Sequence, residues 1–408
     1  MFNNYVGKLT DNKKKALLLI LLFGIISFLG DIIYEGARSV NGPYLKTLGA
    51  NAVNVGIVVG IGELLGYAIR LFSGYFSDKK NAAWFFTILG YSLLISVPLL
   101  SFSNFWQLAA MFIVIERIGK GLRSPAKDTL LSYATKQVGT GIGFGISEFL
   151  DQLGATLGPL IFMIFFLTTG NSQKTLIDYQ NGYSLLWIPF VLLLIVVLFA
   201  YFKVKTPETL ESSENQPTGF TKVFWFYSLF TFITTFGFIN FAIIGFHLKA
   251  KAIIPDSQIP LLYTIAMVID AIFALIVGKI YDKYKALHHN EQGGLLILVF
   301  IPIVTIFILP LAFSKHLVLI ITSMVFWGIV MGTHETIMKA AIADITSINK
   351  RGTGYGIFNL IYGLALFGGS LVAGYLYEIS IPLLISIFIF IEILSVPFFF
   401  LLKKEIKR

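Results

Sequence analysis

Long apolar stretches separated by short polar segments run through the whole chain. A membrane-spanning helix needs about 20 consecutive, mostly apolar residues. Twelve stretches meet this requirement, at 16–45, 52–77, 82–101, 105–132, 140–168, 183–202, 220–248, 258–281, 293–313, 316–343, 353–378 and 382–402. The pattern therefore predicts an all-α membrane protein with twelve transmembrane helices. The first stretch follows three lysines but has no cleavage pattern, so we expect it to be retained as a span rather than removed as a signal peptide.

The segment 204–219 interrupts this pattern near the middle of the chain. It is rich in Pro, Glu, Ser and Thr, a composition typical of flexible linkers. It separates two halves of six predicted spans, 1–203 and 220–408, and short motifs recur at corresponding places in the two halves. Gly74, Asp78 and Lys79 follow the second span, and Gly278, Asp282 and Lys283 follow the eighth. A Gly-x-Gly-x-Gly motif follows the fourth span at 139–143 and the tenth at 352–356. The repeats favour a duplicated pair of parallel six-helix bundles.

Composition supports a membrane setting. Of the 408 residues, 56% are hydrophobic and only 13% are charged, against about 25% charged in an ordinary soluble domain. A soluble domain could not bury so much apolar surface. The chain contains no cysteine, which excludes disulfides and cysteine-ligated metals.

The distribution of basic residues predicts the orientation. If the N-terminus is cytoplasmic, nineteen Lys and Arg residues fall in cytoplasmic segments, and the outer loops hold five: Lys46, Lys174, Lys249, Lys251 and Lys315. Positive charge favours the cytoplasmic side, so we expect both termini in the cytoplasm and a multi-pass protein of the cell membrane. The net charge of +9 then reflects membrane topology rather than nucleic-acid binding.

Three motifs resemble those of the major facilitator superfamily. The Gly74–Lys79 motif and its repeat at Gly278–Lys283 resemble the best known signature of that family, although Lys79-Lys80-Asn81 departs from its usual continuation. Arg117, Gly119 and Gly121 resemble the fourth-helix motif. In the fifth span, Gly145, Gly154, Gly158 and Pro159 are spaced as in the antiporter motif of drug exporters, without its closing Gly-Gly.

The resemblance implies two six-helix bundles that rock around a central cavity and expose it alternately to each side. It also implies a monomer without a cofactor or metal, and a transporter rather than an enzyme. For the repeated motif it implies a gating role at the cytoplasmic helix ends. The glycines of the fifth span are equally typical of close helix packing.

Ionisable residues inside the spans are the main candidates for function, because each costs about 2.5–3.5 kcal/mol at a helix centre. The first half holds thirteen: Asp31, Glu35, Arg38, Glu63, Arg70, Glu116, Arg117, Lys120, Arg123, Lys127, Asp128, Glu148 and Asp151. The second half holds five: Asp270, Glu335, Lys339, Asp344 and Glu392. Helical spacing puts Asp31, Glu35 and Arg38 on one face of the first span, and a basic stripe on one face of the fourth. The imbalance places the predicted ion coupling in the first half.

Burial favours the protonated form of a carboxyl group, whereas a nearby arginine favours the ionised form. An arginine that moves with the helices would therefore link protonation to conformation. For proton coupling we predict Asp31, Glu35, Arg117, Glu116, Glu148 and Asp151. For the substrate cavity we predict Arg38, Glu63, Arg70, Lys120, Arg123, Asn240, Asp270, Glu335, Lys339, Asn359 and Tyr362. The alternative is that Arg117–Asp128, Glu63–Arg70 and Glu116–Lys120 are purely structural or gating pairs.

Proton-coupled export of a small molecule is the leading functional hypothesis. The alternative is proton-coupled uptake of an organic anion held by Arg38, Arg70, Lys120 and Arg123. An intramembrane enzyme is disfavoured, since Glu148–Asp151 and His334–Glu335 lack any accompanying nucleophile motif, HExxH or phosphate loop. A sensor that keeps the scaffold but moves no solute is a further alternative. The expected partners are a small-molecule substrate, protons and the lipid bilayer.

Overall fold

The computed structural model describes residues 11–79, 82–138, 140–203, 220–288, 292–346 and 351–406, which are helical almost throughout and contain no β-strand. The first half comprises α2 (Asp11–Thr47), α3 (Ala52–Lys79), α4 (Ala83–Ser92), η1 (Leu93–Ile95), α5 (Ser96–Leu99), η2 (Leu100–Phe102), α6 (Trp106–Val138), α7 (Thr140–Thr168), α8 (Leu176–Ser184) and α9 (Trp187–Lys203). The second half comprises α10 (Lys222–Phe236), α11 (Phe241–Ala250), α12 (Gln258–His288), η3 (Gly293–Val299), α13 (Phe300–Ala312), α14 (Leu317–Ile345), α15 (Arg351–Ile379) and α16 (Ile381–Ile406).

Eleven segments of the described residues are long and apolar enough to cross a membrane. They match eleven of the predicted spans, mostly within a few residues. The sixth differs most, because α8 and α9 extend its start from the predicted residue 183 to Leu176. The predicted fourth span is the 33-residue helix α6. It is long enough to cross a membrane, but the charged residues at its centre make it more polar than the other eleven segments. Its length is nevertheless that of its neighbours, and it packs between α3, α4 and α7.

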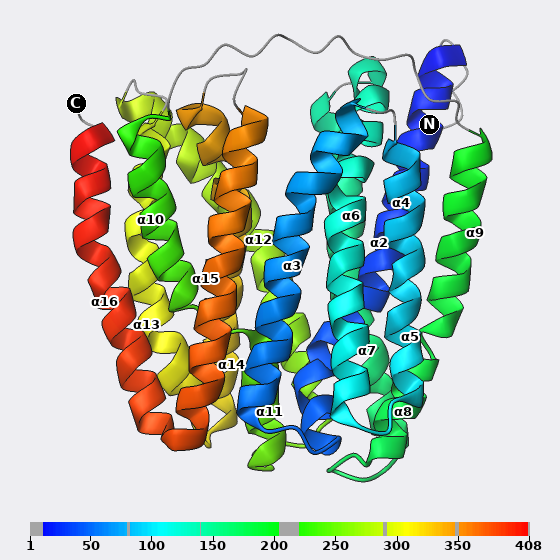
Figure 1. Ribbon diagram of the computed structural model, residues 1–408, viewed down its shortest axis with the longest axis vertical. Helices are drawn as coiled ribbons and strands as arrows, with labels where there is room; N and C mark the ends of the chain where they lie inside the picture. Colours follow the sequence, from blue (N-terminus) through cyan, green and yellow to red (C-terminus); the bar gives the residue numbers. More distant parts are fainter. Residues whose placement is uncertain are drawn as a thin grey trace.

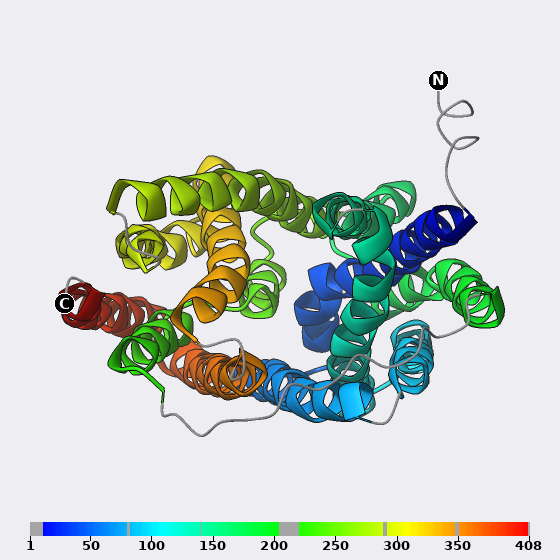
Figure 2. The same ribbon diagram turned by 90° about the horizontal axis from the view of Figure 1, so that it is seen from above.

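The helices form two groups that lie side by side (Figures 1 and 2). Helices α2–α9 make one group and α10–α16 the other. The groups meet where α3 packs against α15, where α7 packs against α12 and where α2 packs against α11. The start of α2 and the end of α16 lie at the same end of the molecule (Figure 1). The linker predicted at 204–219 lies outside the described residues.

The first helix of each group is built differently. In the first group α2 is a single 37-residue helix. In the second group the corresponding span is broken between α10 and α11. Asn240 caps α11 by accepting a 3.0 Å hydrogen bond from the Ala242 N–H, and the Trp327 indole donates a 3.0 Å bond to the Ile239 carbonyl. These two contacts satisfy polar groups that the break exposes, so the break is a stable part of the fold.

Two glycines of α7 bring it into backbone contact with α2. A Cβ at Gly154 would lie 2.4 Å from the Phe28 carbonyl oxygen, and one at Gly158 would lie 2.5 Å from that of Ile32. Neither distance leaves room for a side chain. Gly145, in contrast, has open space around it. The glycine pattern of the predicted fifth span therefore accounts for close helix packing at two of its three positions.

The two groups are locked together at the end of the molecule away from the start of α2, which we call the far end. Asp256, fully buried between α11 and α12 in sequence, accepts hydrogen bonds from the Lys174 N–H at 2.7 Å and the Tyr179 hydroxyl at 3.1 Å. Its own N–H donates to the Ser172 carbonyl at 2.9 Å. Lys249 forms an ion pair with the same carboxylate. The first three contacts join one group to the other.

Candidate functional site

A buried network of charged residues connects α2, α3 and α6. At its centre one carboxylate oxygen of Glu63 lies 3.3 Å from the Arg38 guanidinium and 3.3 Å from that of Arg117. Both arginines also donate to the Tyr34 hydroxyl, Arg38 at 3.1 Å and Arg117 at a shorter distance. A buried carboxylate is tolerated only with such partners. Glu63 is therefore paired with two cations from two different helices.

The network continues along α6 through Glu116. Its two oxygens lie 3.5 Å from Arg117 and 3.6 Å from Arg123. The Arg123 guanidinium also stands over the ring of Tyr91, 5.3 Å from its centroid, and is buried between α4 and α6. Arg123, predicted to line a substrate cavity, thus belongs to the interior of the first group.

Glu35 joins the network to the second group of helices. Its Oε1 lies 3.7 Å from Arg38 and 4.0 Å from Lys120. Its Oε2 accepts a 2.6 Å hydrogen bond from the Tyr263 hydroxyl of α12. The Lys120 ammonium also sits 3.7 Å from the centroid of the Tyr34 ring, a cation–π contact. Of the carboxyl groups in this network, Glu35 is the one that touches both halves.

Two further carboxyl groups, those of Asp31 on α2 and Asp151 on α7, lie where these two helices pack together. Asp151 forms a 3.4 Å ion pair with Lys127, which also donates a 2.7 Å hydrogen bond to Ser27. Asp31 faces the same region, and Asp151 and Lys120 are among its electrostatic neighbours. Within the described residues, Asp31 has neither a hydrogen bond nor an ion pair. Asp31 can therefore take up a proton without breaking an existing contact.

The polar residues of the second group are sparser. Asp270 on α12 is only 3% exposed, its Oδ1 has no hydrogen-bond partner among the described residues, and Glu335 and Glu35 are its electrostatic neighbours. The Tyr362 hydroxyl lies 3.4 Å from His334 Nδ1. The Tyr362 ring meets the ring of Tyr67 edge to face across the two groups, at 5.0 Å between centroids.

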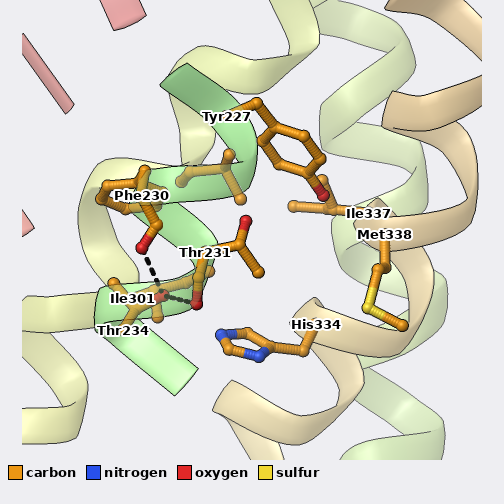
Figure 3. Close-up of a pocket in the computed structure, with 9 residues that line it drawn as sticks. Tyr227, Phe230, Thr231, Thr234, Ile301, His334, Ile337 and Met338 are labelled. Atoms are coloured by element: carbon orange, nitrogen blue, oxygen red, sulfur yellow. Dashed lines mark hydrogen bonds between the residues drawn. The ribbon is translucent and has the colours of Figure 1, made fainter. Parts of the chain in front are cut away.

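A small pocket opens beside His334 inside the second group (Figure 3). Its walls are formed by Tyr227, Phe230, Thr231, Thr234, Leu298, Ile301, His334, Ile337 and Met338. The imidazole ring points from α14 toward Thr231 and Thr234 of α10 (Figure 3). The hydroxyl of Thr234 is already bonded to backbone carbonyls of its own helix. The pocket is thus mostly apolar, and it lies apart from the charged network.

The ion pairs differ from those predicted on single helices. Glu63 pairs with Arg38 and Arg117 instead of Arg70. The Arg70 guanidinium stacks on Tyr67, 4.4 Å from the ring centroid. Arg117 pairs with Glu63 and Glu116, whereas Asp128 is exposed. The reason is geometric, because neighbouring helices place opposite charges closer than positions along one helix do.

Other predicted residues take different places. Glu148 is exposed and Asn359 is half-buried. Asn240 caps α11, which fully explains its side chain. The side chains of Asp78, Lys79 and Lys339 lie outside the described residues. Asp282 and Lys283 are exposed, and Glu335 is exposed on α14.

The repeated motif occupies equivalent positions in the two groups. A Cβ at Gly74 would lie 3.6 Å from Pro125 of α6, and a Cβ at Gly278 would lie 3.7 Å from Thr336 of α14. In both cases the second long helix of the group touches the fourth long helix. On the same α12 helix, Tyr281 and Lys285 both donate 2.9 Å bonds to Asp344 of α14. The gating role that the resemblance implies for Gly278, Asp282 and Lys283 stays a prediction.

Sequence reasoning missed three residues that connect the two groups or close the network. Tyr263 carries no signal, because a single tyrosine in an apolar span is typical of packing. Asp256 lies outside every predicted span, and Tyr34 is one of several aromatic residues that could equally line a cavity. Within the described residues, no group of three or more His, Cys, Asp and Glu side chains gathers as a metal site would require.

Comparisons with known proteins agree on the family. The model of the Major Facilitator Superfamily matches residues 16–370 and 254–408. An uncharacterised protein of Mycobacterium tuberculosis is 34% identical over 393 residues, covering 94% of this chain and 92% of that protein. An uncharacterised MFS-type transporter of Methanocaldococcus jannaschii is 27% identical over 383 residues, covering 91% and 92%. A solved variant of the nucleoside transporter NupG has a TM-score of 0.73 at 15% identity, covering 94% of this chain and 99% of that one.

Proposed function

Because this chain belongs to the major facilitator superfamily, we propose that it is a proton-coupled secondary active transporter that exports a small molecule across the cell membrane. The two groups of helices act as two bundles, 1–203 and 220–408, that rock about a central site. Helix α6 supplies the twelfth span, and both termini face the cytoplasm. The locked far end is then the outer side, and the structure represents a state closed to the outside.

The contact between Glu35 and Tyr263 carries the proposal. Ionised Glu35 attracts Arg38 and Lys120 within its own bundle and accepts a hydrogen bond from the other bundle. A proton on Glu35 removes the charge that holds both cations and weakens the charge-assisted bond from Tyr263. Protonation of one carboxyl group thereby changes the contact between the bundles, which is what ion-coupled alternating access requires.

Asp31 is assigned the uptake of the proton. It lacks a paired cation, so protonation there costs no ion pair. Asp151 is its electrostatic neighbour, and two neighbouring carboxylates favour sharing a proton. Glu63 and Glu116 each contact two cations and are assigned a structural role.

Proteoliposomes that contain a pH-sensitive dye test this function across many solutes at once. Solutes from a chemically diverse library are added to the outside, and proton movement is followed at zero membrane potential. We expect at least one solute to drive proton flux with the wild type, and no flux with Asp31→Asn or Glu35→Gln. Asp178→Asn, which changes a carboxylate at the exposed α8 cap, is the matched control and should retain the flux. Unchanged flux in both test variants would refute the proton assignment.

Uptake of an organic anion is the second candidate, and Arg70 is the observation that favours it. Arg38, Lys120 and Arg123 are already paired with carboxylates. Arg70 has no ion pair among the described residues, its Nε lacks a hydrogen-bond partner, and its guanidinium lies on Tyr67 at the contact between the bundles. Right-side-out and inverted vesicles distinguish the two directions. Uptake that is lost in Arg70→Gln favours the anion importer over the exporter.

A further inference from the structure

A carboxyl group outside the charged network lies near the middle of the last helix. Glu392 is on α16, which runs from Ile381 to Ile406. Its side chain is 1% exposed, and neither carboxyl oxygen has a hydrogen-bond partner among the described residues. The other ionisable residues of α16 are Lys403, Lys404 and Glu405, all near its C-terminal end, so an acidic residue at the middle of the helix needs a physical reason.

The Glu392 carboxyl group lies against the break in the seventh span. A Cβ at Gly237 would lie 2.3 Å from Glu392 Oε1 and 3.0 Å from its Cδ. Gly237 is the C-cap of α10, where the helix ends and its last carbonyl groups lose their regular partners. Thr235, two residues earlier, is fully buried and its hydroxyl also lacks a partner. The two carboxyl oxygens of Glu392 and the hydroxyl oxygen of Thr235 are thus three buried polar atoms without a hydrogen-bond partner, all in the region of the break.

The elements packed against α16 carry few ionisable residues, and their two cations, Lys222 and Arg351, are the first residues of α10 and α15. Helix α13 and η3 contain no ionisable residue, and α10 contains Lys222, at its first residue, and Tyr227. Helix α15 contains Arg351, Tyr355, Tyr362, Tyr375, Tyr377 and Glu378. Glu392 forms neither an ion pair nor a side-chain hydrogen bond with any side chain that the structure describes, and its carboxyl group is buried.

We propose that Glu392 is a second proton-binding site of this transporter, separate from Asp31 and Glu35, which exchanges its proton when the break between α10 and α11 opens. An ionised carboxylate without a partner is not sustained in an apolar interior. A bound metal cation would need several oxygen ligands, whereas a proton needs only the carboxyl group itself. In the closed state the proton stays on Glu392. When the break opens, the carboxylic acid gives H⁺ to water and becomes a hydrated carboxylate.

The inference uses the proposed function only for the motion of the two bundles, and it can be tested without a substrate. The chain has no cysteine, so spin labels can be attached at Gln107→Cys and Lys315→Cys without removing native thiols. Both residues are exposed; Gln107 is the second residue of α6, and Lys315 lies two residues before α14. Pulsed electron-spin measurements on the full chain in lipid nanodiscs give the ratio of open to closed populations as a function of pH.

Proton binding at Glu392 predicts a specific linkage. A plot of the base-ten logarithm of the open-to-closed ratio against pH should have a smaller slope in Glu392→Gln than in the wild type. The difference between the two slopes should be up to about one, since one proton is released on opening. Glu392→Leu should give the same smaller slope, and it replaces Glu392→Gln in the experiment if the glutamine variant does not fold. Glu405→Gln removes the other glutamate of α16 and should leave the slope unchanged. Equal slopes in the wild type and both Glu392 variants would overturn the proposal.

Two further measurements separate the remaining outcomes. If sodium chloride, compared with choline chloride at fixed pH, shifts the wild type but not Glu392→Gln, the ligand is a metal cation and the proton assignment is wrong. If neither Glu392 variant folds, infrared spectra of a variant that combines Asp31→Asn, Glu35→Gln and Asp270→Asn decide. The proposal requires the C=O stretch of a protonated carboxylic acid to remain at neutral pH in this variant, and its absence would overturn the proposal. A changed slope together with no solute-driven flux would retain this site and reject the transport function.

Discussion

Asp256→Asn tests whether the lock at the far end sets the balance between open and closed states. In the wild type, one oxygen of Asp256 accepts the Lys174 N–H and the Tyr179 hydroxyl from the other bundle. Its other oxygen has no partner among the described residues. An asparagine can therefore keep its carbonyl oxygen toward the two donors and its amide NH₂ toward the empty side. The substitution removes the charge while preserving the shape.

The expected effect follows from the loss of charge assistance. Each hydrogen bond to a charged group contributes about 1.5–3 kcal/mol, so the two bonds between the bundles contribute about 3–6 kcal/mol. Charge-assisted bonds are roughly twice as strong as neutral ones, so asparagine should lose about half of this, ~1.5–3 kcal/mol. The open-to-closed ratio should then rise by a factor of roughly 10 to 150.

Distances between labels at Gln107→Cys and Lys315→Cys measure this ratio directly. Asp178→Asn is the matched control, because Asp178 is an acidic residue of the same end whose contacts stay within one bundle, in the capping box of α8. It should cost about 1 kcal/mol of local helix stability and leave the distances unchanged. An Asp256→Asn distribution identical to the wild type would show that Asp256 does not hold the far end closed. Equal opening in the control would show that the effect is not specific to the lock.

Three other substitutions probe contacts described above. Gly158→Leu should cost about 1–3 kcal/mol or more of stability, because the leucine side chain would meet the α2 backbone. The thermal unfolding temperature should fall accordingly, whereas Gly145→Leu, in open space, should change it little. Equal losses in the two variants would reject the packing role. Tyr263→Phe removes the bond to Glu35 between the bundles, which should cost the closed state about 1.5–3 kcal/mol and raise the open-to-closed ratio roughly 10- to 150-fold; no change would mean that this bond does not contribute to the equilibrium. Asn240→Ala should speed hydrogen exchange in α11 but not in α10, with about 1 kcal/mol lost from the cap; equal exchange in both helices would contradict the capping role.

Hydrophobic patterning predicted most of the fold because each span is a local property of the sequence. The predicted third span, 82–101, coincides with Ala83–Phe102, although it is assembled from α4, η1, α5 and η2. The fourth span was predicted despite its charges, and α6 covers it. Helix identity is decided by about 20 neighbouring residues, so distant contacts are not needed to find it.

The sequence identified the individual charged residues of the site but not which of them form ion pairs with one another. Helical spacing predicted Asp31, Glu35 and Arg38 on one face of α2; Glu35 and Arg38 form an ion pair there, whereas Asp31 faces α7. The partner of Glu63 depends on how α2, α3 and α6 are rotated and tilted against one another, and the sequence of one helix does not encode this. For the same reason Tyr263 and Asp256, whose roles come from contacts with the other bundle, gave no signal.

The first span of the first group is one continuous helix, α2, whereas the first span of the second group is broken between α10 and α11, and this difference has a consequence for the way the far end opens. Helix α2 runs without a break from the charged network to the far end, so a displacement of the network is passed along the helix to that end. The ten-residue α11, which packs against α2, is joined to α10 only through the break. We therefore expect α11 to swing before the bundles rotate, so that the first step toward the outside is a local gate movement of a single short helix.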